Sequence, residues 1–210
     1  MGIPSKVDSL FKLDMEKAGP KVCQGEPEKW TVCEGEEVLM ITLLRGILPQ
    51  AFPVLTKPDK WTRKHQSGIS KCERDPSRGG HFAEKKRKGE TEVSVKQKAT
   101  DIYLKASHAY EKKLGDLLFQ YFVANRAKLG IQQVIWNKQA SLGESIGPYP
   151  RTKARKEECD AKETPWDKIS CLHQDHLHVE FDRVEGDKDH SCMLRYIVAK
   201  IKDALGGQTA

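Results

Sequence analysis

The sequence predicts an α+β fold in which helices alternate with the strands of one small sheet. Three observations support this prediction: two stretches with apolar residues at helical spacing, a β-branched run between them, and a later stretch of alternating apolar and polar residues. The chain has 210 residues, which suits one domain with an elaborated arm, and it shows no internal repeat.

The first half of the chain carries weaker structural signals than the second. Residues 1–59 contain many prolines, so we expect at most a short helix near Val7–Lys17 and a helix or strand at Val38–Leu48. Residues 60–97 lack periodicity and are rich in glycine, serine, lysine and arginine, which predicts a long loop or basic arm. We therefore divide the chain into an N-terminal extension of unknown role (1–59), the basic arm (60–97) and a main domain (98–210).

The strongest helix signal lies at 109–129. Apolar side chains recur there three and four residues apart, and Gly130 follows at the position where a helix commonly ends. The β-branched run at 131–136 then predicts a buried strand. Trp136 at its end is expected in the core, and a position lining a substrate cleft is the alternative.

The last part of the main domain is predicted to contain a loop, a strand and a helix. Glycines and prolines are frequent over 137–170, which favours an irregular loop. Apolar and polar residues alternate over Leu177–Phe181, as in a strand with one buried face. Helical spacing returns at Met193–Leu205, and Gly206 ends that helix.

Positive charge is concentrated in one segment. The net charge is +6, and Lys60–Lys113 holds 15 lysines and arginines against 7 acidic residues. Such a segment suits an anionic polymer or a protein partner, and the alternatives are a solvated loop and nucleic-acid binding. No apolar run is long enough to span a membrane, and the first residues lack the apolar core of a signal peptide. The sequence sets no oligomeric state.

The six cysteines favour disulfide bonds. They are even in number, are widely spaced and form no C-x-x-C pair, which argues against a zinc ribbon. Up to three disulfides would suit a secreted protein, whereas buried reduced thiols are the alternative. Cys159 and Cys171 flank a polar stretch that a covalent link would constrain.

Three histidines lie close together near the end of the main domain. His173, His176 and His178 fall within six residues, and His176 and His178 point to the same side if they lie on a strand. Neutral imidazole is a common zinc ligand and also transfers protons near neutral pH. A surface histidine cluster without a metal is the alternative interpretation.

Several sequence blocks, read together, resemble the C-terminal catalytic domain of secreted bacterial peptidoglycan peptidases. These enzymes belong to the LAS superfamily, named for lysostaphin, D-Ala-D-Ala metallopeptidase and sonic hedgehog. The resemblance covers about Gly89 to Phe181. It rests on Leu114-Gly115-Asp116, on Leu129-Gly130-Ile131 followed by Val134-Ile135-Trp136-Asn137, and on His173-Gln174-Asp175-His176-Leu177-His178-Val179.

The resemblance implies a fold, a metal and a reaction. It implies a small antiparallel sheet packed with helices, and zinc-dependent hydrolysis of an amide in a cell-wall peptide. His178 and Asp101 match the zinc ligands, Asp101 through the block Ala99-Thr100-Asp101-Ile102. His176 matches the general base or proton relay, and His173 matches the outer histidine of the cleft.

One position departs from the pattern of these peptidases. A zinc-binding histidine is expected seven residues before Asp101, where this chain has Ser94. Three interpretations follow: the site has lost a ligand, His81 supplies the missing ligand, or the alignment of this stretch is shifted. The main alternative function is a non-catalytic binding protein on the same fold, in which the basic arm holds an anionic polymer or a protein partner.

Overall fold

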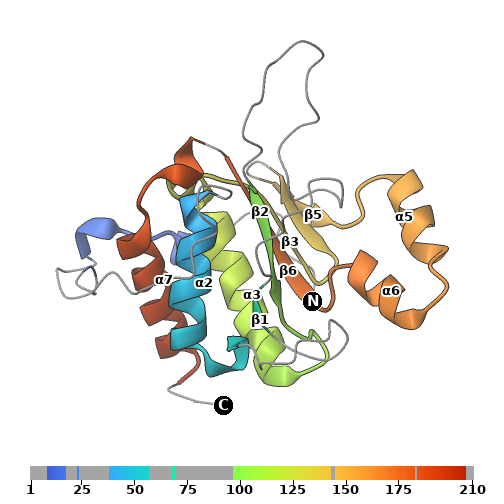
Figure 1. Cartoon of the computed structure of the whole chain (residues 1–210), viewed down its shortest axis with the longest axis horizontal. Coiled ribbons are helices and arrows are strands. Elements are labelled where there is room, and N and C mark those ends of the chain that lie inside the picture. The colour runs from blue at the N-terminus through green and yellow to red at the C-terminus, as the bar shows by residue number, and fades with distance from the viewer. Residues whose placement is uncertain are drawn as a thin grey trace, which may run out of the picture.

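The computed structural model describes residues 9–17, 23, 38–56, 68–69, 97–142, 145–182 and 184–206. One antiparallel sheet separates two groups of helices (Figure 1). Helices α2 (Leu39–Ala51), α3 (Ala109–Ala124) and α7 (Ser191–Ala204) lie on one side of the sheet, and α5 (Lys153–Asp160) and α6 (Pro165–Cys171) lie on the other. The α+β class predicted from the sequence is therefore confirmed.

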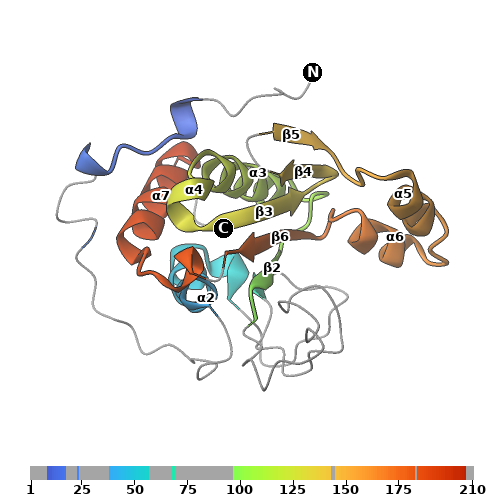
Figure 2. The ribbon, with the colours of Figure 1, turned by 90° about the horizontal axis from the view of Figure 1, so that it is seen from above.

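The sheet is built around its last strand. Its order is β1-β2-β6-β3-β4-β5, and every neighbouring pair is antiparallel. β6 thus lies between β2 and β3, which come earlier in the chain (Figure 2). The strands are β1 (Gly68–Ile69), β2 (Ala99–Tyr103), β3 (Ile131–Trp136), β4 (Gln139–Leu142), β5 (Ser145–Pro148) and β6 (His176–Phe181).

The hydrophobic core fills the space between the sheet and the first group of helices. Ile102, Val134, Leu177 and Val179 point from the strands into this core, and each is 0% exposed. Helix α2 contributes most of its residues to the same core, which explains why the apolar run at Val38–Leu48 forms a helix. The short helices η3 (Pro53–Leu55), η5 (Glu185–Asp187) and α4 (Arg126–Leu129) complete this side.

Helix α3 lies unusually close to β3 at Gly115. A Cβ atom on Gly115 would come 2.4 Å from Cζ2 of Trp136, whose side chain is fully buried. The indole Nε1 donates a hydrogen bond to Asp116 at 2.9 Å, which fixes the ring against the helix. Trp136 is therefore a core residue, as the sequence predicts.

Several predicted elements are confirmed with small shifts in their ends. The strand at 131–136 is observed as predicted, and β6 begins one residue before Leu177. The helix predicted at 109–129 is observed as α3 and α4, and Gly130 ends α4 with φ +65°, a conformation that favours glycine. The helix predicted at 193–205 is observed at 191–204.

The prediction of a loop over 137–170 is wrong. This range holds the β-hairpin formed by β4 and β5, followed by the helices α5 and α6. We call the pair of helices the α5–α6 hairpin. Thr152 and Thr164 cap these helices by accepting hydrogen bonds from backbone N–H groups three residues later. Within α5 only Cys159 is buried, so the segment lacks the apolar stripe by which a helix is recognised in a sequence.

Disulfide bonds join two cysteine pairs among the described residues. Cys159 is bonded to Cys171 and links α5 to α6, and Cys23 is bonded to Cys192 at the start of α7. The link predicted around the polar stretch is thus confirmed. Cys33 and Cys72 lie outside the described residues.

The N-terminal region and the basic arm are described only in part. The short helix predicted near Val7–Lys17 is observed as two 3-10 turns, η1 (Ser9–Phe11) and η2 (Met15–Lys17). Most of the basic arm lies outside the described residues. Among the helices that are described, none has the length and apolar character needed to cross a membrane.

Candidate functional site

The open face of the sheet carries the predicted site residues on two adjacent strands. His176 and His178 alternate along β6 with the core residues Leu177 and Val179, so both histidines point away from the core. On β2, Asp101 is paired in register with His178, and Tyr103 with His176. The sheet thus brings together residues that are separated by more than 70 positions in the sequence.

The Asp101 carboxylate forms the centre of this group. Its Oδ1 atom lies 2.9 Å from Nδ1 of His178 and 3.9 Å from Nε2 of His176. All three side chains are largely buried, with 9–12% of their area exposed. The low exposure strengthens electrostatic interactions among them relative to those in water.

His176 is held in one orientation by its neighbour in the sequence. Its Nδ1 atom lies 2.7 Å from Oδ1 of Asp175. A carboxylate in this position accepts the Nδ1–H hydrogen bond, which leaves Nε2 without a proton in the neutral ring. His176 therefore presents a proton acceptor on the side that faces Asp101.

His173 lies just before β6 in a turn with well-defined backbone contacts. Its φ is +52°, in the left-handed region, and its carbonyl accepts a hydrogen bond from the backbone of Asn137 at 2.7 Å. On the other side of this turn, the carbonyl of Asp175 accepts a hydrogen bond from Leu104. The turn is thus held between the β3–β4 turn and the end of β2, which places the His173 ring beside the other two.

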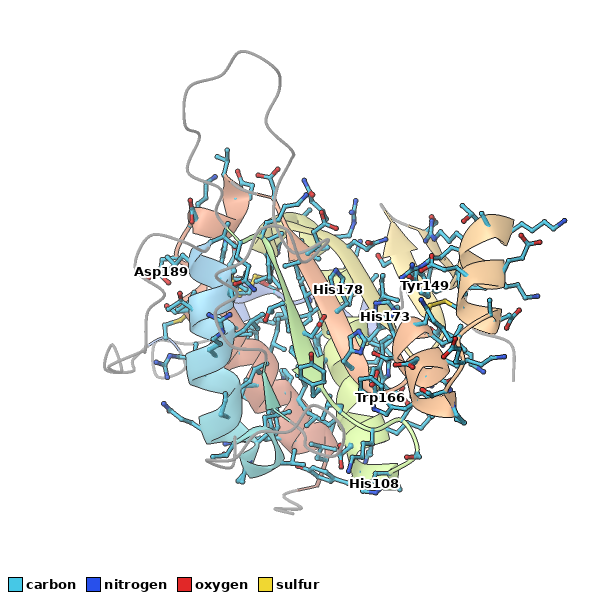
Figure 3. All side chains as sticks on the ribbon, turned by 45° about the vertical axis from the view of Figure 1, so that its right-hand side comes forward. His108, Tyr149, Trp166, His173, His178 and Asp189 are labelled. Carbon is cyan, nitrogen blue, oxygen red and sulfur yellow. A yellow bond between two sulfur atoms is a disulfide. The ribbon has the colours of Figure 1, made fainter. Side chains whose placement is uncertain are left out.

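The rings around His173 form a continuous aromatic row. The His173 ring centroid lies 4.4 Å from that of His176, 5.7 Å from that of His178 and 4.8 Å from that of Tyr149. Tyr103 extends the row at 5.7 Å from His176. Figure 3 shows Tyr149, His173 and His178 close together, with His108 and Asp189 far from them.

Burial keeps His173 neutral. It lowers the pKa of His173 from 6.5 to about 2, and the neighbouring His176 and His178 add to this shift. Asp101 and the Cys171 backbone act in the opposite direction but do not cancel it. The Nδ1 atom of His173 is buried and has no hydrogen-bond partner among the described residues.

This low pKa predicts that the metal-free protein loses stability in mild acid. Below pH 6.5 the unfolded chain binds a proton at residue 173, whereas the folded chain does not until the pH approaches 2. As the pH falls from 7 to 5, we expect proton binding at this residue in the unfolded chain to lower the free energy of unfolding by about 2 kcal/mol. Urea unfolding at pH 7 and pH 5 measures this loss of stability in the wild type and in His173→Asn. An equal loss in the two proteins would contradict the low pKa of His173.

An open cleft of about 850 Å³ adjoins His173 and His176, whereas His178 is not among its lining residues. Asp101, Tyr103, His173 and His176 line its inner wall, and the α5–α6 hairpin forms its outer wall. Trp166 of α6 lies on that outer wall (Figure 3). The outer wall residues are Arg155, Glu158, Ala161, Lys162, Glu163, Trp166, Asp167, Ser170 and Cys171. The volume is in the range of pockets that bind small molecules or short peptides.

The donor atoms of Asp101 and His178 are of the types that bind zinc. Two ligands of a tetrahedral zinc lie about 3.3 Å apart, since each is about 2.0–2.2 Å from the metal. The observed 2.9 Å is shorter and is the length of a hydrogen bond between Nδ1 of His178 and the carboxylate, so a metal would have to replace the shared proton. However, no group of three histidine, cysteine, aspartate or glutamate side chains within the described residues is arranged to hold a metal ion. Within the described part of the site, Asp101 and His178 are therefore two candidate ligands, and no third lies beside them.

The structure brings together four of the five residues predicted for the site. These are Asp101, His173, His176 and His178, whereas His81 lies outside the described residues, as does Ser94. Tyr103, Asp175 and Trp166 also lie at the site but were not predicted from the sequence. Two of these had a signal in the sequence: Tyr103 follows Asp101 at the strand period, and Asp175 directly precedes His176.

Comparisons with known proteins give one partial match. The family model described as VldE, C-terminal domain, matches residues 85–157, about a third of the chain. The matched region includes Asp101 and the strands β3–β5 but ends before the three histidines. No curated protein and no solved structure matches this chain.

Proposed function

We propose that this protein is a zinc-dependent hydrolase of amide bonds in peptides of the cell-wall type. The observation that carries the proposal is the arrangement of one carboxylate and two imidazoles around a single oxygen atom, Oδ1 of Asp101. These groups lie beside an open cleft that is large enough for a short peptide.

Asp101 and His178 would hold the metal in this proposal. When bound, zinc polarises the carbonyl of the scissile amide and lowers the pKa of water toward neutrality. The two ligands lie on paired positions of adjacent strands, so the sheet fixes their separation before any metal is present. A catalytic zinc usually has three protein ligands, and His81 is our candidate for the third.

His176 acts as the general base in this proposal. His176 lines the cleft, and because Asp175 accepts the Nδ1–H hydrogen bond, Nε2 is the nitrogen left to accept a proton. The same nitrogen can return the proton to the leaving amine. Asp175 keeps the ring in the correct tautomer and stabilises the positive charge that develops on it.

His173 assists as a neutral group. Since its pKa is about 2, it carries no positive charge at neutral pH that would repel a cation at the site. Its turn is fixed by backbone hydrogen bonds, so the ring can contact a substrate without rearrangement.

The resemblance to LAS-superfamily peptidases supports the proposed amide hydrolysis and a location outside the cell. The blocks that carry it include the described residues from Leu114 to Asn137 and from His173 to Val179. Disulfides within the described residues support a secreted protein that acts on a wall polymer outside the cell.

The second candidate function is a non-catalytic binding protein on the same fold. One observation favours it: within the described residues, no three side chains are arranged as metal ligands. In this case the cleft binds a peptide without cleaving it, and the basic arm holds an anionic polymer or a protein partner.

Hydrolysis of wall-type peptides distinguishes the two candidates. We expect the purified protein with one equivalent of zinc to release new amino groups from soluble wall peptides, and a chelator to stop the release. The matched control is Asp101→Asn, which keeps the size of the side chain but removes the ligand charge. Peptide binding without any release of amines would favour the binding protein.

A further inference from the structure

The outer wall of the cleft differs in character from the histidine side. It is formed by the α5–α6 hairpin, and its side chains include acidic, basic and aromatic groups. The residues that line the whole cleft include two cations, Arg155 and Lys162, and four carboxylates. The carboxylates belong to Asp101, Glu158, Glu163 and Asp167. The cleft therefore has an excess of negative charge.

The two cations of the wall are already paired with one carboxylate. Arg155 Nη1 lies 2.5 Å from Glu158 Oε2, and Lys162 Nζ lies 3.5 Å from the other oxygen of Glu158. Arg155 also donates a hydrogen bond to the hydroxyl of Tyr149. Each of these cations therefore has a carboxylate partner within the wall.

Glu163 and Asp167 are not neutralised in this way. Neither forms an ion pair with a lysine or arginine in the described part of the chain, and Asp167 accepts a hydrogen bond from the Thr164 hydroxyl at 2.6 Å. Trp166 lies between them in the sequence and lines the same wall. A wall that carries both an aromatic ring and uncompensated carboxylates favours a cationic group, because the ring face and the carboxylates each attract positive charge.

A second, independent observation indicates that the cleft binds a ligand. His173 is 8% exposed and lines the cleft, and its Nδ1 atom is buried without a partner in the described structure. Buried polar atoms without a hydrogen bond are rare in folded proteins and often mark a site that a ligand or water completes.

We propose that the α5–α6 wall selects substrates that carry a positively charged amine, with Trp166 and Glu163 as its main contacts. The proposal rests on the proposed function in one respect, because it calls the charged amine part of a substrate. A non-catalytic binding protein would show the same preference for a charged amine. It gives the α5–α6 hairpin, held by the Cys159–Cys171 disulfide, a role in specificity.

Binding of two matched peptides to the EDTA-treated wild type tests this proposal separately from hydrolysis. The probes are acetyl-Ala-Ala-Lys-Ala-Ala-amide and the same peptide with Nε-acetyl-lysine, which differ only in the positive charge. At low salt we expect the lysine peptide to bind about tenfold more tightly. Glu163→Gln and Trp166→Leu should each reduce this preference to about threefold or less. Glu157→Gln, an exposed residue of α5 outside the cleft, should leave it unchanged.

Each outcome decides the question. Equal or tighter binding of the acetylated peptide would overturn the proposal, as would a preference that both variants retain. Failure of the lysine peptide to bind below about 10 mM would also overturn it, because that affinity is weaker than two favourable contacts provide. A charge preference without any hydrolysis would leave this proposal standing and remove the proposed enzyme activity.

Discussion

Replacing His176 by alanine is expected to lower the rate of amide hydrolysis by about 10²–10⁴-fold, the usual contribution of a general base. The loss follows because His176 lines the cleft with Nε2 3.9 Å from Oδ1 of Asp101, while Asp175 holds its Nδ1. The side chain is not one of the proposed zinc ligands, so the zinc content should stay the same. Initial rates and zinc content of the two proteins measure both effects.

Two further variants make this test specific. His108→Ala removes a histidine that lies far from the cluster and should leave the rate unchanged (Figure 3). Asp175→Asn keeps His176 in place but weakens the hydrogen bond to its Nδ1, so we expect a smaller loss and a shifted pH profile. Hydrolysis at the wild-type rate by His176→Ala would remove this residue from the mechanism.

Gly115→Ala is expected to destabilise the protein by about 1–3 kcal/mol, the usual cost of overpacking a core. In an exposed helix the same change stabilises by about 1 kcal/mol, so the sign itself is informative. The new Cβ atom would lie 2.4 Å from Cζ2 of Trp136, and this ring is fixed by its hydrogen bond to Asp116. Urea unfolding measures the change.

Gly147→Ala is the matched control for this prediction. Gly147 lies in β5, and a Cβ atom there would meet no other atom within 4 Å. We expect a change of less than about 0.5 kcal/mol, as at other surface positions. Unfolding of Gly115→Ala at the same urea concentration as the wild type, or at a higher one, would contradict the close packing of α3 on β3 at Gly115.

The elements with a regular apolar pattern could be predicted from the sequence. Helix α7 and strand β6 each bury one face against the core, and this one-sided burial produces the spacing seen in the sequence. The α5–α6 hairpin could not be predicted in this way. It is stabilised by two threonine caps and a disulfide, and these devices leave little apolar periodicity.

The site residues could also be predicted only in part, but the reason differs from that for the α5–α6 hairpin. The strand period of two places His176 and His178 on one face, but it does not identify their partner on another strand. Asp101 precedes His178 by 77 positions, and its assignment came from the resemblance to LAS-superfamily peptidases rather than from the pattern. The outer wall at Trp166 has no sequence signal of its own, because it depends on how the α5–α6 hairpin packs beside the sheet.

The zinc content of the protein purified without chelator tests the central claim most directly. Elemental analysis of the wild type should give one zinc per chain, and Asp101→Ala and His178→Ala should each remove it. His81→Ala, measured beside them, should also lose zinc if His81 is the third ligand. A wild type that binds no zinc even after the metal is added back, or ligand variants that keep their full zinc content, would contradict the proposed site.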